Sequence, residues 1–177
     1  QKKAMELKAA IDQRTTLFPN TGSPKALVLL VEFKDLKFSR THEETKQMFE
    51  NMLSQPGYSH NGATGSVLDY FTDSSNGLFT PQFDVYGPVT LSRDVAYYGE
   101  NTGEGVSDIR PWQMVIDACR LLDDEINFKD YDADGDGEID NVFVFYAGYG
   151  EAQGGPSYTI WPHKFEVQQT VRLDGVR

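Results

Sequence analysis

Hydrophobic residues recur along the chain at two spacings, which together predict an alternation of strands and helices. Strands, marked by continuous or alternating apolar runs, are expected at 25–33, 78–92, 141–149, 159–167 and 169–173. Helices, marked by apolar residues three and four apart, are expected at 3–14, 41–54, 66–75 and 110–126. Prolines in the second of these strands place it at the edge of a sheet. Asp174-Gly175 is expected to form a hairpin turn.

Polar residues at the starts of the helices support these boundaries. Thr41 and Glu44 have the spacing of a capping box, and so do Ser66 and Asp69. Asp108 is the expected N-cap of the helix that follows it. The order of the elements indicates an α/β or α+β domain with a mixed twisted sheet and flanking helices.

Domain boundaries follow from the same pattern. Residues 1–24 are interpreted as an N-terminal helix and linker, a candidate remnant of a pro-segment, and residues 25–177 as one domain. The last hairpin is cut off at Arg177, so we expect the chain to be incomplete at its C-terminus and to belong to something longer.

Composition and charge exclude some classes of function. The 177 residues, with a mass of 19.9 kDa, suit one domain of ordinary size. The net charge is −11, and six acids lie between Asp130 and Asp140, so the remaining surface is only mildly acidic and offers no basic face for nucleic acid. No apolar run approaches the ~20 residues of a membrane span. The single cysteine, Cys119, permits no internal disulfide.

The acidic run YDADGDGEID at 131–140 is the strongest chemical signal in the sequence. Like charges about 5 Å apart repel by roughly 1 kcal/mol even in water, and the run contains no basic residue. Three aspartates at alternate positions, followed by a glycine, match the D-x-D-x-D-G pattern of calcium loops, in which the side chains converge on the ion. The predicted Ca²⁺ ligands are Asp132, Asp134, Asp136, Glu138 and Asp140.

The second half of the loop departs from an EF-hand. Glu138, at position 7, would offer its backbone carbonyl, but position 12, where an EF-hand carries a bidentate Glu, is Phe143 in an apolar strand. We expect a structural ion that joins the helix before the loop to the strand after it. The alternative is a solvated acidic turn. The missing ligand is expected from water or from Asp123, Asp124 or Asp130.

Histidine and cysteine give weaker signals. His42 and His60 are expected at the surface, His163 either in a structural position or facing a cleft, and Cys119 in the core. The chain contains no H-E-x-x-H motif and no histidine at zinc-ligand spacing. The glycines of AGYGEAQGG, at 147–155, either let another chain approach the preceding strand closely or form an ordinary loop.

Four stretches together resemble the immune inhibitor A-like family of secreted bacterial zinc metallopeptidases. They are ALVLLVEFKD (26–35), GYSHNGATGSVLDYFTDSSNGLFTPQFDVYGPVTLS (57–92), DYDADGDGEIDNVFVFYAGYGEAQGG (130–155) and TIWPHK (159–164).

This resemblance implies a secreted endopeptidase with a metzincin- or thermolysin-like catalytic domain, of which the chain is the N-terminal part, acting on proteins or peptides. In such a domain a zinc ion held by H-E-x-x-H polarises the scissile carbonyl and activates water. Since that motif is absent, no catalytic residue is carried over, and we expect the 177 residues alone to be inactive. The resemblance also implies that strand 142–150 forms the upper rim of the substrate cleft. The residues expected there are Ala147, Gly148, Tyr149 and Gly150.

Two other functions are compatible with the residues. One is a non-catalytic extracellular calcium-binding module for protein or carbohydrate, because nothing catalytic is present. The other is an inhibitory or pro-segment, suggested by the basic helix at 2–14. The next ~100 residues of the parent gene would separate them from a peptidase, which requires H-E-x-x-H on a helix.

Overall fold

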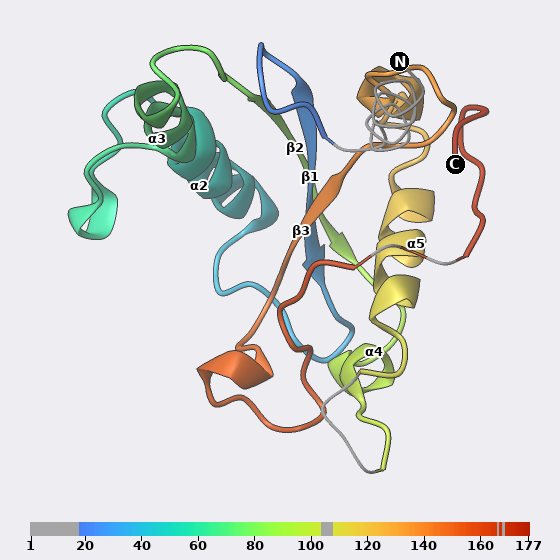
Figure 1. Cartoon of the computed structure of the whole chain (residues 1–177). Coiled ribbons are helices and arrows are strands. Elements are labelled where there is room, and N and C mark those ends of the chain that lie inside the picture. The colour runs from blue at the N-terminus through green and yellow to red at the C-terminus, as the bar shows by residue number, and fades with distance from the viewer. Residues whose placement is uncertain (1–17, 104–107, 166, 168) are drawn as a thin grey trace, which may run out of the picture.

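A three-stranded parallel sheet forms the centre of the structure (Figure 1). The structure is a computed structural model that describes residues 18–103, 108–165, 167 and 169–177. Strand β1 (Lys25–Glu32) lies between β2 (Gln82–Thr90) and β3 (Val142–Tyr146) and runs parallel to both. The expectation of a mixed sheet is therefore wrong for the described residues, because crossovers containing helices return each strand in the same direction.

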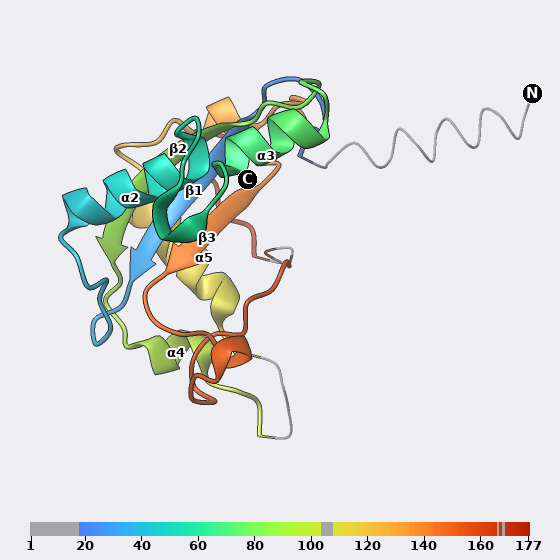
Figure 2. The same ribbon diagram turned by 90° about the vertical axis from the view of Figure 1, so that its left-hand side faces the viewer.

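Helices cover both faces of this sheet. Helix α2 (His42–Ser54) and α3 (Val67–Ser74) lie on one side, and α5 (Pro111–Leu121) lies on the other (Figures 1 and 2). The predicted capping boxes of α2 and α3 are confirmed. The short helix α4 (Val95–Gly99) was not predicted. The helix predicted at 3–14 lies outside the described residues.

Within the described ranges, three short 3-10 helices occur in the connections, at His60–Gly62 (η1), Phe128–Tyr131 (η2) and Glu151–Gln153 (η3). None of the described helices is both long and apolar enough to cross a membrane.

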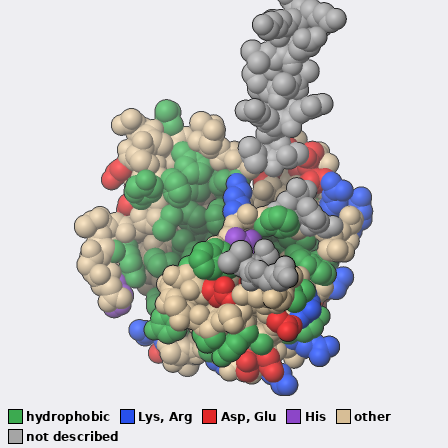
Figure 3. All heavy atoms as spheres, turned by 60° about the horizontal axis from the view of Figure 1, so that its bottom comes forward, with side chains coloured by type: hydrophobic (Ala, Val, Ile, Leu, Met, Phe, Trp, Pro, Cys, Tyr) green, Lys and Arg blue, Asp and Glu red, His purple; other side chains and the backbone are tan. Residues whose placement is uncertain are grey.

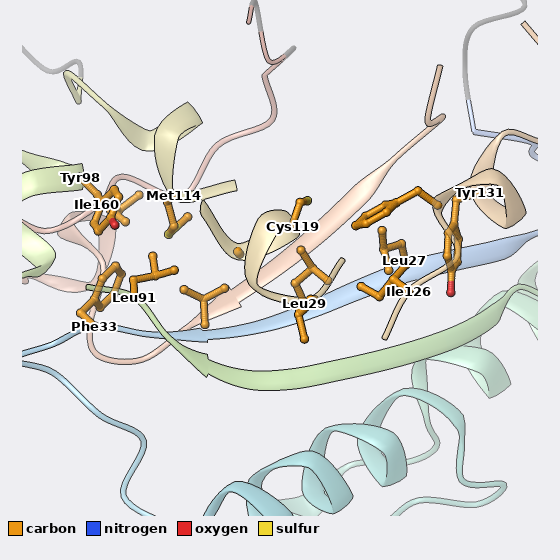
Figure 4. Packing of buried hydrophobic residues seen from close by; sticks show 14 of the residues in the cluster. Leu27, Leu29, Phe33, Leu91, Tyr98, Met114, Cys119, Ile126, Tyr131 and Ile160 are labelled. Carbon is orange, nitrogen blue, oxygen red and sulfur yellow. The ribbon is translucent and has the colours of Figure 1, made fainter. Parts of the chain in front are cut away.

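Strand β1 is buried along nearly its whole length, as its continuous apolar run predicts. Residues 26–31 are all completely buried. Leu27 and Leu29 face α5 (Figure 4), and Val31 belongs to the same cluster, whereas Val28 and Leu30 pack on the side of α2. This two-sided burial explains why the run does not alternate with polar residues.

Cys119 belongs to the core between α5 and the sheet, as predicted (Figure 4). Burial raises the pKa of its thiol to about 12, with a smaller effect from the charge of Asp123. The thiol is therefore protonated at neutral pH, and its role is packing.

Two expectations for the C-terminal part are wrong. The described residues of 159–167 and 169–173 form no strand, and the antiparallel bridge between Leu173 and Val176 is isolated. The turn within that bridge is confirmed, since Asp174 and Gly175 both have positive φ, of 52° and 88°. Apolar and β-branched residues favour a strand only where a neighbouring strand is available for pairing.

Asp108 does not cap α5. Arg110 occupies the N-cap position without a side-chain hydrogen bond. The Asp108 carboxylate instead accepts a hydrogen bond from the Trp161 N–H at 2.9 Å. This contact joins segments 53 residues apart, and local sequence does not reveal it.

Candidate metal site

Three aspartates converge in the loop between η2 and β3. Asp132, Asp134 and Asp136 each offer a carboxylate oxygen that lies within 4.8 Å of the others. Among the described residues, this is the group of three or more His, Cys, Asp or Glu side chains that could hold one metal ion. These are positions 1, 3 and 5 of the predicted calcium loop.

Backbone N–H groups of the loop hold these carboxylates in place. Asp132 accepts hydrogen bonds from the N–H groups of Gly135 (2.8 Å), Asp136 (3.1 Å) and Gly137 (3.0 Å). Asp136 accepts one from the Glu138 N–H at 2.8 Å. Gly137 has φ of 87°, a conformation that residues with a side chain rarely adopt, so the glycine is needed at the predicted position.

The other two predicted ligands lie beside this cluster. Asp140 accepts a hydrogen bond from the Ala133 N–H at 2.8 Å, which joins the two ends of the loop. Burial raises the pKa of Asp140, and the negative charges of the three clustered aspartates raise it further. The Glu138 side chain pairs with Arg177, which leaves its backbone carbonyl as the group it can offer to an ion.

The C-terminal hairpin packs on this loop, a contact that the sequence did not predict. The Ile139 N–H donates to the Arg177 carbonyl, and the Arg177 N–H donates to the Gly137 carbonyl, both at 2.9 Å. The Asp174 carboxylate accepts from the Phe128 N–H at 2.9 Å. The loop is therefore held between η2 and the hairpin.

The residues considered for a further ligand do not join the cluster. Asp130 binds the Lys25 ammonium at 2.6 Å and the Asn127 amide at 2.8 Å. Asp123 and Asp124 are exposed and lie outside the group of three. Water or backbone carbonyls would therefore complete the coordination of an ion.

The kinds of ligand atom that the described residues offer indicate which metal ion they could bind. Several carboxylate oxygens within a short loop suit Ca²⁺, which takes six to eight oxygen ligands. Zinc prefers nitrogen and sulfur, but the three histidines are not brought together. His42 contacts Glu32, His163 contacts the Trp161 carbonyl, and His60 is exposed at the start of η1. The described residues therefore do not fit a zinc site.

A second acidic centre, at Glu32, was missed by the sequence analysis. Glu32 ends β1 and is 4% exposed. Its carboxylate accepts hydrogen bonds from the Phe38 N–H (3.2 Å) and the Thr90 hydroxyl, and it lies 3.0 Å from His42 Nε2 and 3.2 Å from Lys37 Nζ. The only signal in the sequence is a polar residue within an apolar run.

These contacts control the charge of Glu32. Burial by itself would raise its pKa, but the bonds from Thr90, His42, Lys37 and Phe38 together lower it to about 2. Glu32 is therefore ionised at neutral pH. It connects β1, β2 and the start of α2, and this role is structural.

The glycines expected at the substrate cleft make close contacts within the chain. A Cβ on Gly148, which has φ of 98°, would lie 2.4 Å from the Leu36 side chain. One on Gly150 would lie 2.8 Å from the Tyr146 hydroxyl. Ala147 is buried and donates its N–H to the Val31 carbonyl, whereas Tyr149 is 75% exposed. The regular strand ends at Tyr146 rather than at position 150.

Comparison with known proteins agrees with the resemblance noted from the sequence. The family described as immune inhibitor A peptidase M6, catalytic domain, matches residues 13–177. The pre-pro-metalloprotease PrtV of Vibrio cholerae serotype O1 is 27% identical over 187 residues, which cover 86% of this chain and 20% of that protein. Immune inhibitor A of Bacillus thuringiensis subsp. alesti is 27% identical over 175 residues, which cover 81% of this chain and 26% of that protein.

The chain thus spans between a fifth and about a quarter of the length of these curated relatives. The family match, in contrast, extends over almost all of the chain. On this evidence the chain belongs to the immune inhibitor A (M6) peptidase family, within its catalytic domain.

Proposed function

We propose that the chain is the N-terminal part of the catalytic domain of a secreted zinc metalloendopeptidase, and that a calcium ion on the aspartate loop stabilises it. The match of residues 13–177 to the M6 catalytic domain is the main support for this proposal. The name of the relative PrtV describes it as a metalloprotease, which supports the reaction class. The convergence of three aspartate carboxylates supports the calcium ion.

The zinc ion in this proposal is held by residues outside the chain, where it would polarise the scissile carbonyl and activate water. The residues of this chain have a supporting role. The aspartate loop fixes the position of β3 relative to α5 and η2. Within the described residues β3 is an edge strand, so an extended peptide could pair with its free side.

Comparing two proteins tests the proposal. The 177-residue chain and a longer version that includes the next ~100 residues of the parent would be assayed for casein cleavage. We expect the short chain to be inactive and the long one to be active until zinc is chelated. The long chain with the Glu of its H-E-x-x-H motif changed to Gln is the matched inactive control.

Two outcomes would contradict the proposal. One is chelator-sensitive cleavage by the 177 residues alone. The other is a longer chain without H-E-x-x-H that binds protein or carbohydrate without cleaving it, which would support a binding module instead.

A further inference from the structure

An apolar groove of about 550 Å³ lies on the side of the sheet that faces α2 and α3. Eleven of its twelve lining residues are apolar, and Asn20 is the exception. Hydrophobic side chains gather visibly on this side of the molecule (Figure 3). The groove therefore lacks the convergent polar groups of a catalytic site, and its chemistry suits an apolar occupant.

Two aromatic residues of β3 line the groove, and they differ in what covers them. Phe145 packs against Phe49 of α2, with ring centroids 5.0 Å apart. Phe143, two residues earlier, packs against Phe18 instead, at 6.1 Å. Parallel sheets are normally covered on both faces, so an element that shields Phe143 and its neighbours would complete this layer.

The polypeptide itself leads into the groove. Phe18, the first described residue, is one of the lining residues, and its ring also lies edge-on to Phe79 at 6.3 Å. The preceding sequence has Ala4, Leu7, Ala10 and Ile11 at helical spacing. A helix over 3–14 would be about 18 Å long. Residues 15–17 could span up to ~10 Å, enough for a reversal of direction.

We propose that residues 3–14 dock in this groove as an amphipathic helix, with Leu7 and Ile11 against its aromatic lining. The segment is attached at Phe18, so its effective concentration at the groove is in the millimolar range, whereas a second copy of the chain is present only at its solution concentration. Docking would add a third helix to the side of the sheet that α2 and α3 cover. This inference is independent of the proposed peptidase activity.

Hydrogen exchange of the 177-residue chain, followed by mass spectrometry, tests the docking. We expect the amides of residues 3–14 to exchange at least about tenfold more slowly than in the synthetic peptide 1–17. The double variant Leu7→Asp/Ile11→Asp should abolish this protection and increase the fluorescence of a hydrophobic dye bound to the groove. Ala9→Asp/Gln13→Asp adds the same charge about 200° around the helix and should retain the protection.

Three results would overturn the inference. The first is exchange in the wild-type chain as fast as in the peptide. The second is protection that increases with protein concentration, which would assign the groove to a second copy. The third is an equal loss of protection in both double variants, which would show that the Leu7 and Ile11 face is not specifically buried.

Discussion

Glu32 and the aspartate loop differ in how the negative charge of their carboxylates is compensated. Glu32 is a single buried carboxylate that receives four donors from its own chain, so its pKa is low. The aspartate loop brings oxygens of three carboxylates within 4.8 Å of one another, and the hydrogen bonds that these carboxylates accept from described residues come from backbone N–H groups. The charge of Glu32 is compensated by donors of the protein itself. The three aspartates of the loop keep negative charges close together, which a bound divalent cation would neutralise.

This difference separates a structural carboxylate from a candidate ligand. Both centres contain acids near the ends of the central strands, and net charge alone does not distinguish them. The distinguishing quantity is the number of cationic or hydroxyl donors that reach the oxygens. We expect the number of these donors to determine how much each centre contributes to stability and whether it binds an ion.

The largest effect is expected for Glu32→Ala. Removing this side chain takes the acceptor from the Phe38 N–H and the Thr90 hydroxyl, and it removes the counter-charge of Lys37. The free energy of unfolding should fall by about 3–4 kcal/mol, roughly the contribution of two hydrogen bonds to a charged group. Urea denaturation would measure the change. Glu43→Ala, an exposed acid in the first turn of α2, is the control and should change stability by no more than about 0.5 kcal/mol. A loss equal to that of the control would show that the contacts of Glu32 are not stabilising.

Acidification should lower the free energy of unfolding slightly less than Glu32→Ala does. The folded-state pKa of Glu32, about 2, lies below its ordinary value of 4.5, so its contribution is complete above pH 4.5 and is lost as the pH falls toward 2. The shift corresponds to about 3 kcal/mol. Unfolding in urea with EDTA at a series of pH values would show a steeper acid loss in the wild type than in Glu32→Gln. Identical slopes would contradict the assignment.

The smallest change in stability is expected when one charge is removed from the aspartate loop in the absence of an ion. In EDTA, Asp136→Asn should raise stability by about 0.5–1 kcal/mol, because it removes like-charge repulsion while the amide oxygen can still accept from the Glu138 N–H. With calcium at 100 times its dissociation constant, the wild type should gain about 2.7 kcal/mol and the order should reverse. An Asp136→Asn variant that is less stable than the wild type in EDTA would argue against repulsion in the loop.

Features encoded by neighbouring residues could be predicted from the sequence. The burial of β1 follows from its uninterrupted apolar run, the capping boxes from residues three apart, and the turn at Asp174-Gly175 from its residue pair. The convergence of Asp132, Asp134 and Asp136 also belongs to this class, because the three aspartates and the glycine that bends the loop lie within six residues.

Features created by distant contacts could not be predicted. Glu32 and Thr90 are 58 residues apart, and Asp108 accepts from Trp161 rather than capping α5. The hairpin at Leu173–Val176 packs on the aspartate loop through Arg177, and nothing local to either segment indicates this. Residues 159–165 have the composition of a strand but pair with no strand in the part of the chain that the structure describes.

Isothermal titration of calcium into the chelator-treated 177-residue chain would show directly whether the aspartate loop binds an ion. We expect one ion per chain, with a dissociation constant between about 10⁻⁷ and 10⁻³ M, the range that oxygen-rich loops cover. Asp132→Asn/Asp136→Asn should abolish the binding, whereas Glu50→Gln/Asp73→Asn, an equal change of charge on α2 and α3, should leave it intact. No binding to the wild type, or equal binding to both variants, would show that the aspartate loop is not a calcium site.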